Sequence, residues 1–265
     1  MTKFATSPFS TGMMRLGGLL LVWWSAQAVA APSLWAVPGP GVVATRLTVE
    51  TELSVHRMAA PTSLAPDLTI GVADGFALAM HHSRASHAQI GAGNGICLLG
   101  PRETLDVDDD ARCSESATGL GLALYSRIPT SVLRTGFAVR GPGALAIELG
   151  SASRWQHSRV WVTLAPTLVV AATGRDRGNR ERIQTAAYLG MSVGNFEVHA
   201  RTGIEGALET FEETFAVPVG AGLSMRTGAF AIGVDAGLDR AFGALNTIRW
   251  RSASLFFEYW IGGGS

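Results

Sequence analysis

The stretch "TIGVADGFALAM" (69–80) decides the fold of this chain. Apolar and small residues alternate up to a short turn at 73–75, and the alternation resumes at Phe76. The same layout returns in "YLGMSVGNFEVHA" (188–200) and in "GLSMRTGAFAIGV" (222–234). Apolar alternation with a period of two, interrupted by a short turn that contains Gly, predicts a β-hairpin. The chain therefore uses one kind of hairpin repeatedly, and one face of each hairpin carries almost no charge.

The same alternation along the rest of the chain predicts about twelve strands. The predicted strands are 46–57, 62–72, 76–84, 118–128, 132–140, 144–151, 159–172, 183–193, 196–204, 215–225, 229–238 and 248–261. Most match the roughly 9–11 residues that a tilted strand needs to cross a bilayer. Short turns are predicted at 73–75, 129–131, 194–195 and 226–228, whereas the segment 152–158 fits this short class less well. Short turns that alternate with long polar loops are typical of an outer-membrane barrel with both termini in the periplasm.

Composition narrows the fold class further. The chain is 47% hydrophobic with a mean hydropathy of +0.24, yet residues 31–265 contain no apolar run of about 18 residues that would predict a membrane helix. One predicted face is rich in Leu, Val, Ile and Phe, and the other carries Gly, Ala, Ser, Thr and scattered charges. We predict an all-β fold, a transmembrane antiparallel up-and-down β-barrel of about 12 strands. A soluble β-sandwich or a lipid-binding barrel is the alternative.

The N-terminus predicts export. Residues 1–30 combine Lys3 and Arg15 with the short apolar run "LGGLLLVWW" and small residues at Ala28 and Ala30, which is the pattern of a signal peptide cut after Ala30. Residues 31–265 then form one barrel domain. Removing these two cations from 21 basic residues leaves 19, against 21 acidic residues. This near-neutral balance argues against a nucleic-acid partner.

The last predicted strand carries a family resemblance. In "SASLFFEYWI", Leu255, Phe257 and Tyr259 alternate on the outward face, which resembles the C-terminal signal that the barrel-assembly machinery recognises in bacterial outer-membrane barrels. The chain departs from that signal by ending in "IGGGS" instead of an aromatic residue. Residues 42–261 resemble a group of uncharacterised outer-membrane β-barrel proteins through "SLAPDLTIGVADGFAL", "GNGICLLG", "GRDRGNRERI" and "FAVPVGAGL". The resemblance implies the outer membrane of a Gram-negative bacterium, with lipid, lipopolysaccharide and the assembly machinery as partners.

Charged residues on the polar face are the candidate site. The predicted lumen-lining residues are Arg46, Glu50, Glu52, His56, Arg134, Arg140, Glu148, Glu197, His199, Arg201, Asp235 and Glu258. As an open pore, these charges would select permeating solutes. As a closed barrel, opposite charges would pair across the lumen, and the protein would act as a structural or adhesion barrel through its surface loops. We expect a passive pore or small-molecule transporter without a cofactor or metal. The closed barrel is the alternative hypothesis.

Three further motifs lie in the polar segment after residue 80. Cys97 and Cys113 predict a disulfide in an oxidising compartment. "HHSRASH" (81–87) leaves a surface lipid hydrolase as a third alternative, but adjacent strand residues point to opposite faces and no orienting third residue is apparent. "DVDDD" (106–110) lacks the spacing of a Ca²⁺ loop and predicts an acidic surface loop. We therefore expect no enzyme.

Overall fold

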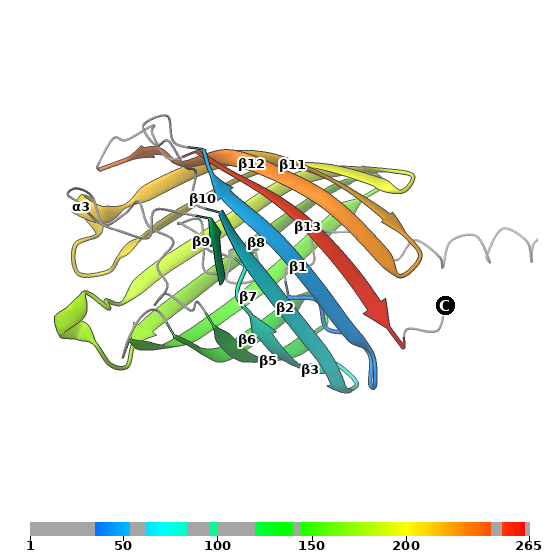
Figure 1. Cartoon of the computed structure of the whole chain (residues 1–265), viewed down its shortest axis with the longest axis horizontal. Coiled ribbons are helices and arrows are strands. Elements are labelled where there is room, and N and C mark those ends of the chain that lie inside the picture. Colours follow the sequence, from blue (N-terminus) through cyan, green and yellow to red (C-terminus); the bar gives the residue numbers. More distant parts are fainter. Residues whose placement is uncertain are drawn as a thin grey trace, which may run out of the picture.

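The fold is known from a computed structural model, which describes residues 35–53, 62–83, 96–99, 120–139, 144–244 and 251–262. These residues form one antiparallel sheet that closes on itself as a barrel (Figure 1). The first strands are β1 (Val43–Glu52), β2 (Thr62–Ala73), β3 (Phe76–His81), β4 (Ile96–Leu99), β5 (Gly121–Ile128), β6 (Ser131–Val139) and β7 (Leu145–His157). The remaining strands are β8 (Val160–Ala171), β9 (Arg182–Val193), β10 (Phe196–Ala207), β11 (Ala216–Thr227), β12 (Phe230–Gly243) and β13 (Arg251–Ile261).

Closure of the sheet occurs where the first strand meets the last. β1 pairs with β13 from Val43 opposite Ile261 to Glu52 opposite Ser252, and its other edge pairs with β2. Every other strand of the ring pairs with its neighbours in sequence, so that β4 alone stands outside a ring of twelve. Closure gives every strand of the ring of twelve a hydrogen-bonded neighbour on both edges, as a bilayer requires. The predicted twelve-stranded antiparallel barrel is confirmed, and the sandwich is excluded.

The short strand β4 was not predicted. It pairs with the first residues of β2, where Ile96 lies opposite Leu64 and Leu99 opposite Thr62. β3 pairs with β2 only from Leu68 onward, so β4 takes the place beside β2 that β3 has left. Its four residues are too few to show a clear alternation in the sequence, which is why this strand could not be recognised.

The two ends of the barrel differ in their connections. At one end, named here the turn end, two-residue turns join the hairpins at 74–75, 129–130, 158–159, 194–195 and 228–229. Gly75, Gly194 and Gly228 adopt positive φ there, which Gly tolerates without steric cost. β1 begins and β13 ends at this same end (Figure 1). The longer connections gather at the opposite end, named here the loop end, with η2 (Arg175–Arg177) and α3 (Phe211–Thr214).

Most of the segment 152–158 is strand, although its sequence indicated a connection. β7 continues to His157, and only Ser158 and Arg159 form the turn into β8. The polar residues here continue the alternation: Arg154 lies on the inner face, and Trp155 lies on the outer face with 53% of its surface exposed. The strand looked like a loop because its inward positions are polar.

The exposed face of the wall is apolar. Leu78, Leu122, Phe137 and Leu189 are each more than half exposed, although large aliphatic and aromatic side chains are normally buried in a water-soluble protein. The inner face carries Ala and polar side chains instead. An apolar outside around a polar inside is the arrangement of a barrel that meets lipid. No helix in the described part of the chain is long and apolar enough to cross a membrane.

Candidate functional site

The inside of the barrel brings the predicted charges together. The residues on the inner face are Arg46, Glu50, Arg134, Glu148, Glu197, His199, Arg201, Asp235 and Glu258. Each follows from the alternation of its strand, because inner and outer positions differ by one residue. Glu52 lies in β1, but its side chain is outside the described part of the structure, as are His56 and Arg140.

Arg134 is the centre of the most deeply buried cluster. From β6 it donates to the Glu148 carboxylate on β7, and both side chains are fully inaccessible to solvent. The Arg134 Nη2 atom lies 2.5 Å from the His81 Nε2 atom of β3, and His81 lies 3.8 Å from Glu148. A buried charge requires such a partner, because desolvation would otherwise destabilise the fold. His81 belongs to the motif "HHSRASH", and nothing in the sequence predicted its position beside Arg134.

A second cluster joins β7, β8, β9 and β10. Arg154 Nη2 donates to Glu197 Oε1 across 3.3 Å, and Ser192 Oγ donates to the same oxygen across 2.8 Å. The guanidinium carbon of Arg154 lies 4.2 Å from the centre of the Trp161 ring, a cation–π distance. Gly190 makes room for this indole, since a Cβ atom there would collide with Trp161. Arg154 escaped prediction because its segment was interpreted as a connection.

A third cluster lies between β10 and β12. The His199 Nε2 and Asp235 Oδ1 atoms are 3.1 Å apart, and the Arg201 Nε atom is 3.7 Å from the same oxygen. The His199 ring is tilted over Tyr188 at 5.7 Å between ring centres. Asp235 thus serves two basic side chains of a neighbouring hairpin.

The inner face near β13 repeats the pattern. Arg226 Nη2 donates to Glu258 Oε1 across 2.8 Å, and Trp260 Nε1 donates to the same oxygen across 2.6 Å. On β1, the guanidinium carbon of Arg46 lies 3.9 Å from the centre of the Phe256 ring. Guanidinium groups beside carboxylates and aromatic rings therefore recur around the lumen, and this combination is well suited to Arg.

Asp67 of β2 accepts hydrogen bonds from the two residues that follow strand β3. Its Oδ1 atom accepts the backbone N–H groups of His82 at 2.7 Å and Ser83 at 3.0 Å, and its Oδ2 atom accepts the Ser83 hydroxyl at 2.5 Å. His82 Nδ1 contacts the carbonyl of Pro66 at 2.7 Å. His82 and Ser83, which belong to the motif of the hydrolase alternative, are therefore held by structural hydrogen bonds after the end of β3. The single Asp inside "SLAPDLTIGV" was the available signal for this role.

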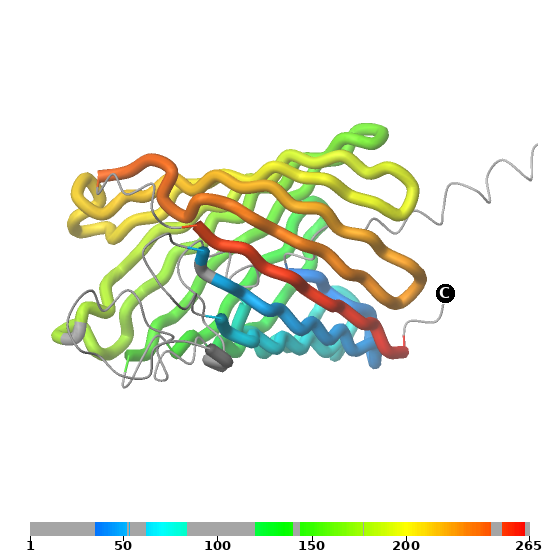
Figure 2. The backbone as a smooth tube through the Cα atoms, turned by 45° about the horizontal axis from the view of Figure 1, so that its top comes forward, coloured from blue at the N-terminus to red at the C-terminus, as the bar shows by residue number. Residues whose placement is uncertain are grey.

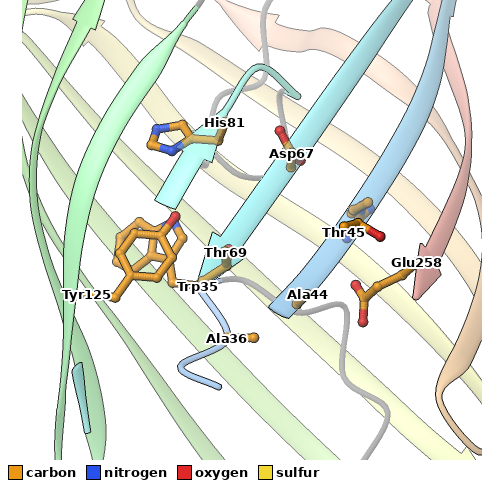
Figure 3. Close-up of a pocket in the computed structure, with 10 residues that line it drawn as sticks. Trp35, Ala36, Ala44, Thr45, Asp67, Thr69, His81, Tyr125 and Glu258 are labelled. Atoms are coloured by element: carbon orange, nitrogen blue, oxygen red, sulfur yellow. The ribbon is translucent and has the colours of Figure 1, made fainter. Parts of the chain in front are cut away.

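A segment that belongs to no strand also lies inside the barrel. Trp35 is 1% exposed, 6.3 Å from the Tyr125 ring and 5.5 Å from the guanidinium carbon of Arg134. Figure 3 shows Trp35 and Tyr125 side by side, with His81 and Asp67 on the neighbouring strands. A cavity of about 30 Å³ remains between this segment and the wall, lined by Arg46, Thr69 and Glu258 among others. A space of this size accommodates about one water molecule.

Metal chemistry and covalent links are the remaining possibilities at the site. Among the described residues, no group of three or more His, Cys, Asp or Glu side chains could hold a metal ion. Cys97 lies in β4, and Cys113 lies outside the described residues, so the Cys97–Cys113 disulfide stays a prediction. The "DVDDD" loop also lies outside them.

Known protein structures share this barrel. The porin NanC matches with a TM-score of 0.51 and 8% identity, over 80% of this chain and 98% of that chain. The porin KdgM matches at 0.47 and 10% identity, over 81% and 98%. An outer-membrane channel from Pseudomonas putida F1 matches at 0.49 and 11% identity, over 88% and 100%.

The comparisons of sequence, in contrast to those of structure, give no match. No protein-family profile matches the chain. No curated protein sequence matches it either. At 8% identity, the likeness to NanC concerns the fold and not the solute. The chain has the fold of an outer-membrane β-barrel of the porin type.

Proposed function

We propose that the protein is a passive outer-membrane pore for small hydrophilic solutes. The observation that carries this proposal is a closed barrel whose lipid-facing wall is apolar while its inner face is lined with Arg and carboxylate side chains. Charged side chains along a lumen interact with the solutes that pass through it, which is how a pore selects them. The turn end, where β1 begins and β13 ends, then faces the periplasm.

The width of the lumen fits a small solute. Barrels of about 8 strands are filled by their own side chains, whereas those of about 16–18 strands leave a wide aqueous channel. A ring of twelve strands is intermediate. Arg154 with Glu197 and Arg226 with Glu258 present both signs of charge side by side. Such a lining favours small neutral or zwitterionic solutes over solutes with a high net charge.

The proposal is tested in planar bilayers with protein purified from outer membranes. A boiled and an unboiled sample on a denaturing gel first establish that the barrel is folded. We expect discrete single-channel currents, and swelling of proteoliposomes in small sugars or amino acids. A correctly folded barrel that gives neither current nor swelling would contradict the pore.

The closed barrel is the second candidate, and one observation favours it. The Arg134–Glu148 pair is completely buried, and Trp35 lies against it, so this part of the lumen is packed like a protein core. A structural barrel that acts through its surface loops would then give a silent bilayer. Proteolytic removal of the surface loops would abolish partner binding but leave the heat-modifiable barrel intact.

A further inference from the structure

We propose that Trp35 sets the size limit of the pore, with residues 35–38 seated in the lumen as a resident constriction. This inference rests on the proposed pore function and identifies the residue that determines which solutes pass. The segment precedes β1 and makes no strand, so its place inside the barrel comes from side-chain contacts with the wall. Trp35, Val37 and Pro38 are all buried.

The wall contains a seat that fits the indole. A Cβ atom at Gly150 of β7 would lie 2.7 Å from the Trp35 ring, so only Gly lets the ring approach this closely. Tyr125 of β5 and the Arg134 guanidinium of β6 complete the seat. Three adjacent strands thus form a complementary surface for one aromatic side chain. The wall here is shaped around the segment.

Hydrogen bonds fix the rest of the segment. Arg127 Nη2 donates to the Val37 carbonyl across 2.6 Å at the turn end of β5. The Gly41 N–H donates to the Gly71 carbonyl across 2.9 Å, and the Gly71 N–H donates to the Val42 carbonyl across 2.9 Å. A Cβ atom at Gly71 would collide with the Gly39 carbonyl. The chain therefore folds sharply from β1 back into the lumen against a Gly on β2.

The constriction joins the wall through Gly41, the residue next to Val42 before β1. Gly41 has a φ of 73°, a conformation that Gly adopts readily, so the fold between β1 and the seat can act as a hinge. With the leader cut at the predicted site after Ala30, Trp35 would be the fifth residue of the mature chain. A short N-terminal arm with one large aromatic ring then lies inside the solute path.

The experiment compares Trp35→Ala with Trp155→Ala. Trp155 lies on the outer face of β7, so its variant removes an indole without touching the lumen. Both variants are checked for heat-modifiability, then measured for single-channel conductance and for swelling with sugars of increasing size. We expect Trp35→Ala to raise conductance roughly twofold or more and to admit larger sugars, because conductance and sieving follow the open cross-section of a pore. Trp155→Ala should match the parent.

A second measurement reports the seating of the segment without a current. Ala36, half-buried beside Trp35, is replaced by Cys, and its labelling by a water-soluble maleimide is compared with that of the parent, which retains Cys97 and Cys113. We expect slow labelling of Ala36→Cys and at least tenfold faster labelling when Trp35→Ala is added, since burial blocks access to the thiol.

The outcomes separate this inference from the pore itself. A conducting parent with an unchanged Trp35→Ala variant would overturn the constriction and leave the pore standing. Fast labelling of Ala36→Cys in the folded parent would also overturn it. If parent and variant are both silent but folded, the proposed pore fails and the constriction fails with it. A silent parent beside a conducting Trp35→Ala variant would support the inference in its strongest form.

Discussion

The lumen around Trp35 and the lumen at the loop end are built differently. Around Trp35, the aromatic rings of Tyr125, Trp161 and Tyr188 and several Arg–carboxylate pairs fill the space. Toward the loop end, the described inner face is lined by Ala and small hydroxyl side chains, with Glu50, Glu205 and Asp239 among them. One wall therefore combines a packed core with a part lined by small and acidic side chains, named here the vestibule.

The difference shows how a closed barrel balances stability and access. Paired and stacked charges hold neighbouring strands together, because a guanidinium between a carboxylate and a ring cannot leave without exposing both. Side chains such as Ala146, Ala171 and Ser252 are buried but small, so they offer few atoms for contact across the lumen. The two parts should therefore respond very differently to substitution.

The largest effect is expected at the centre of the packed part. Glu148→Leu removes the partner of Arg134 and leaves a buried positive charge, which we expect to lower the unfolding free energy by about 3–5 kcal/mol. Urea titration of the gel mobility shift in detergent measures it. Glu209→Leu is the control, because Glu209 pairs with Arg180 on the exposed surface, where such a pair contributes only about 0–1 kcal/mol. Equal losses would refute the contrast between core and surface.

A smaller loss is expected where Trp161 packs. Gly190→Val places a side chain against the indole, and we expect overpacking to cost about 1–3 kcal/mol. Ala200→Val adds bulk on the outer face of β10 and should be nearly neutral. The same urea titration reports both, and a neutral Gly190→Val would show that this part of the lumen is looser than a core.

The loop-end part should tolerate the loss of a single polar contact. Ser252 Oγ donates to Asp239 across 2.6 Å, and Ser252→Ala should cost about 1.5–3 kcal/mol if that carboxylate stays dry. We expect the vestibule to admit water, so the measured loss should fall below about 1 kcal/mol. A loss comparable to that of Glu148→Leu would remove the distinction between the two parts.

The smallest effect concerns ion preference. The triple variant Glu50→Gln, Glu205→Gln and Asp239→Asn removes acidic groups from the vestibule without changing its shape, and should lower the cation-to-anion permeability ratio roughly twofold. Reversal potentials in a salt gradient measure this ratio. The outward residue Thr45, replaced by Val, serves as a neutral control.

Sequence alternation predicted which face each strand residue takes, but not which charges meet. Arg134 and Glu148 occupy predicted strands, yet their contact depends on the register that sets Gly150 opposite Arg134. His81 is the last residue of β3, where the alternation ends. Arg154 was missed because polar inward residues resemble a loop. Trp35 left no periodic trace, since "SLWAVPGPG" is rich in Pro and Gly and its position comes only from tertiary contacts.

The seam between β1 and β13 has a consequence for assembly. β1 and β13 are the first and last strands along the chain. The ring can therefore close only after the last strand is present. The wall that receives Trp35 comes from β5, β6 and β7, which precede closure along the chain. The segment that carries Trp35 therefore has a docking surface before the seam forms, and Figure 2 shows this seam with β13 in red beside β1 in blue. The wall can therefore form around residues 35–38 before the barrel closes.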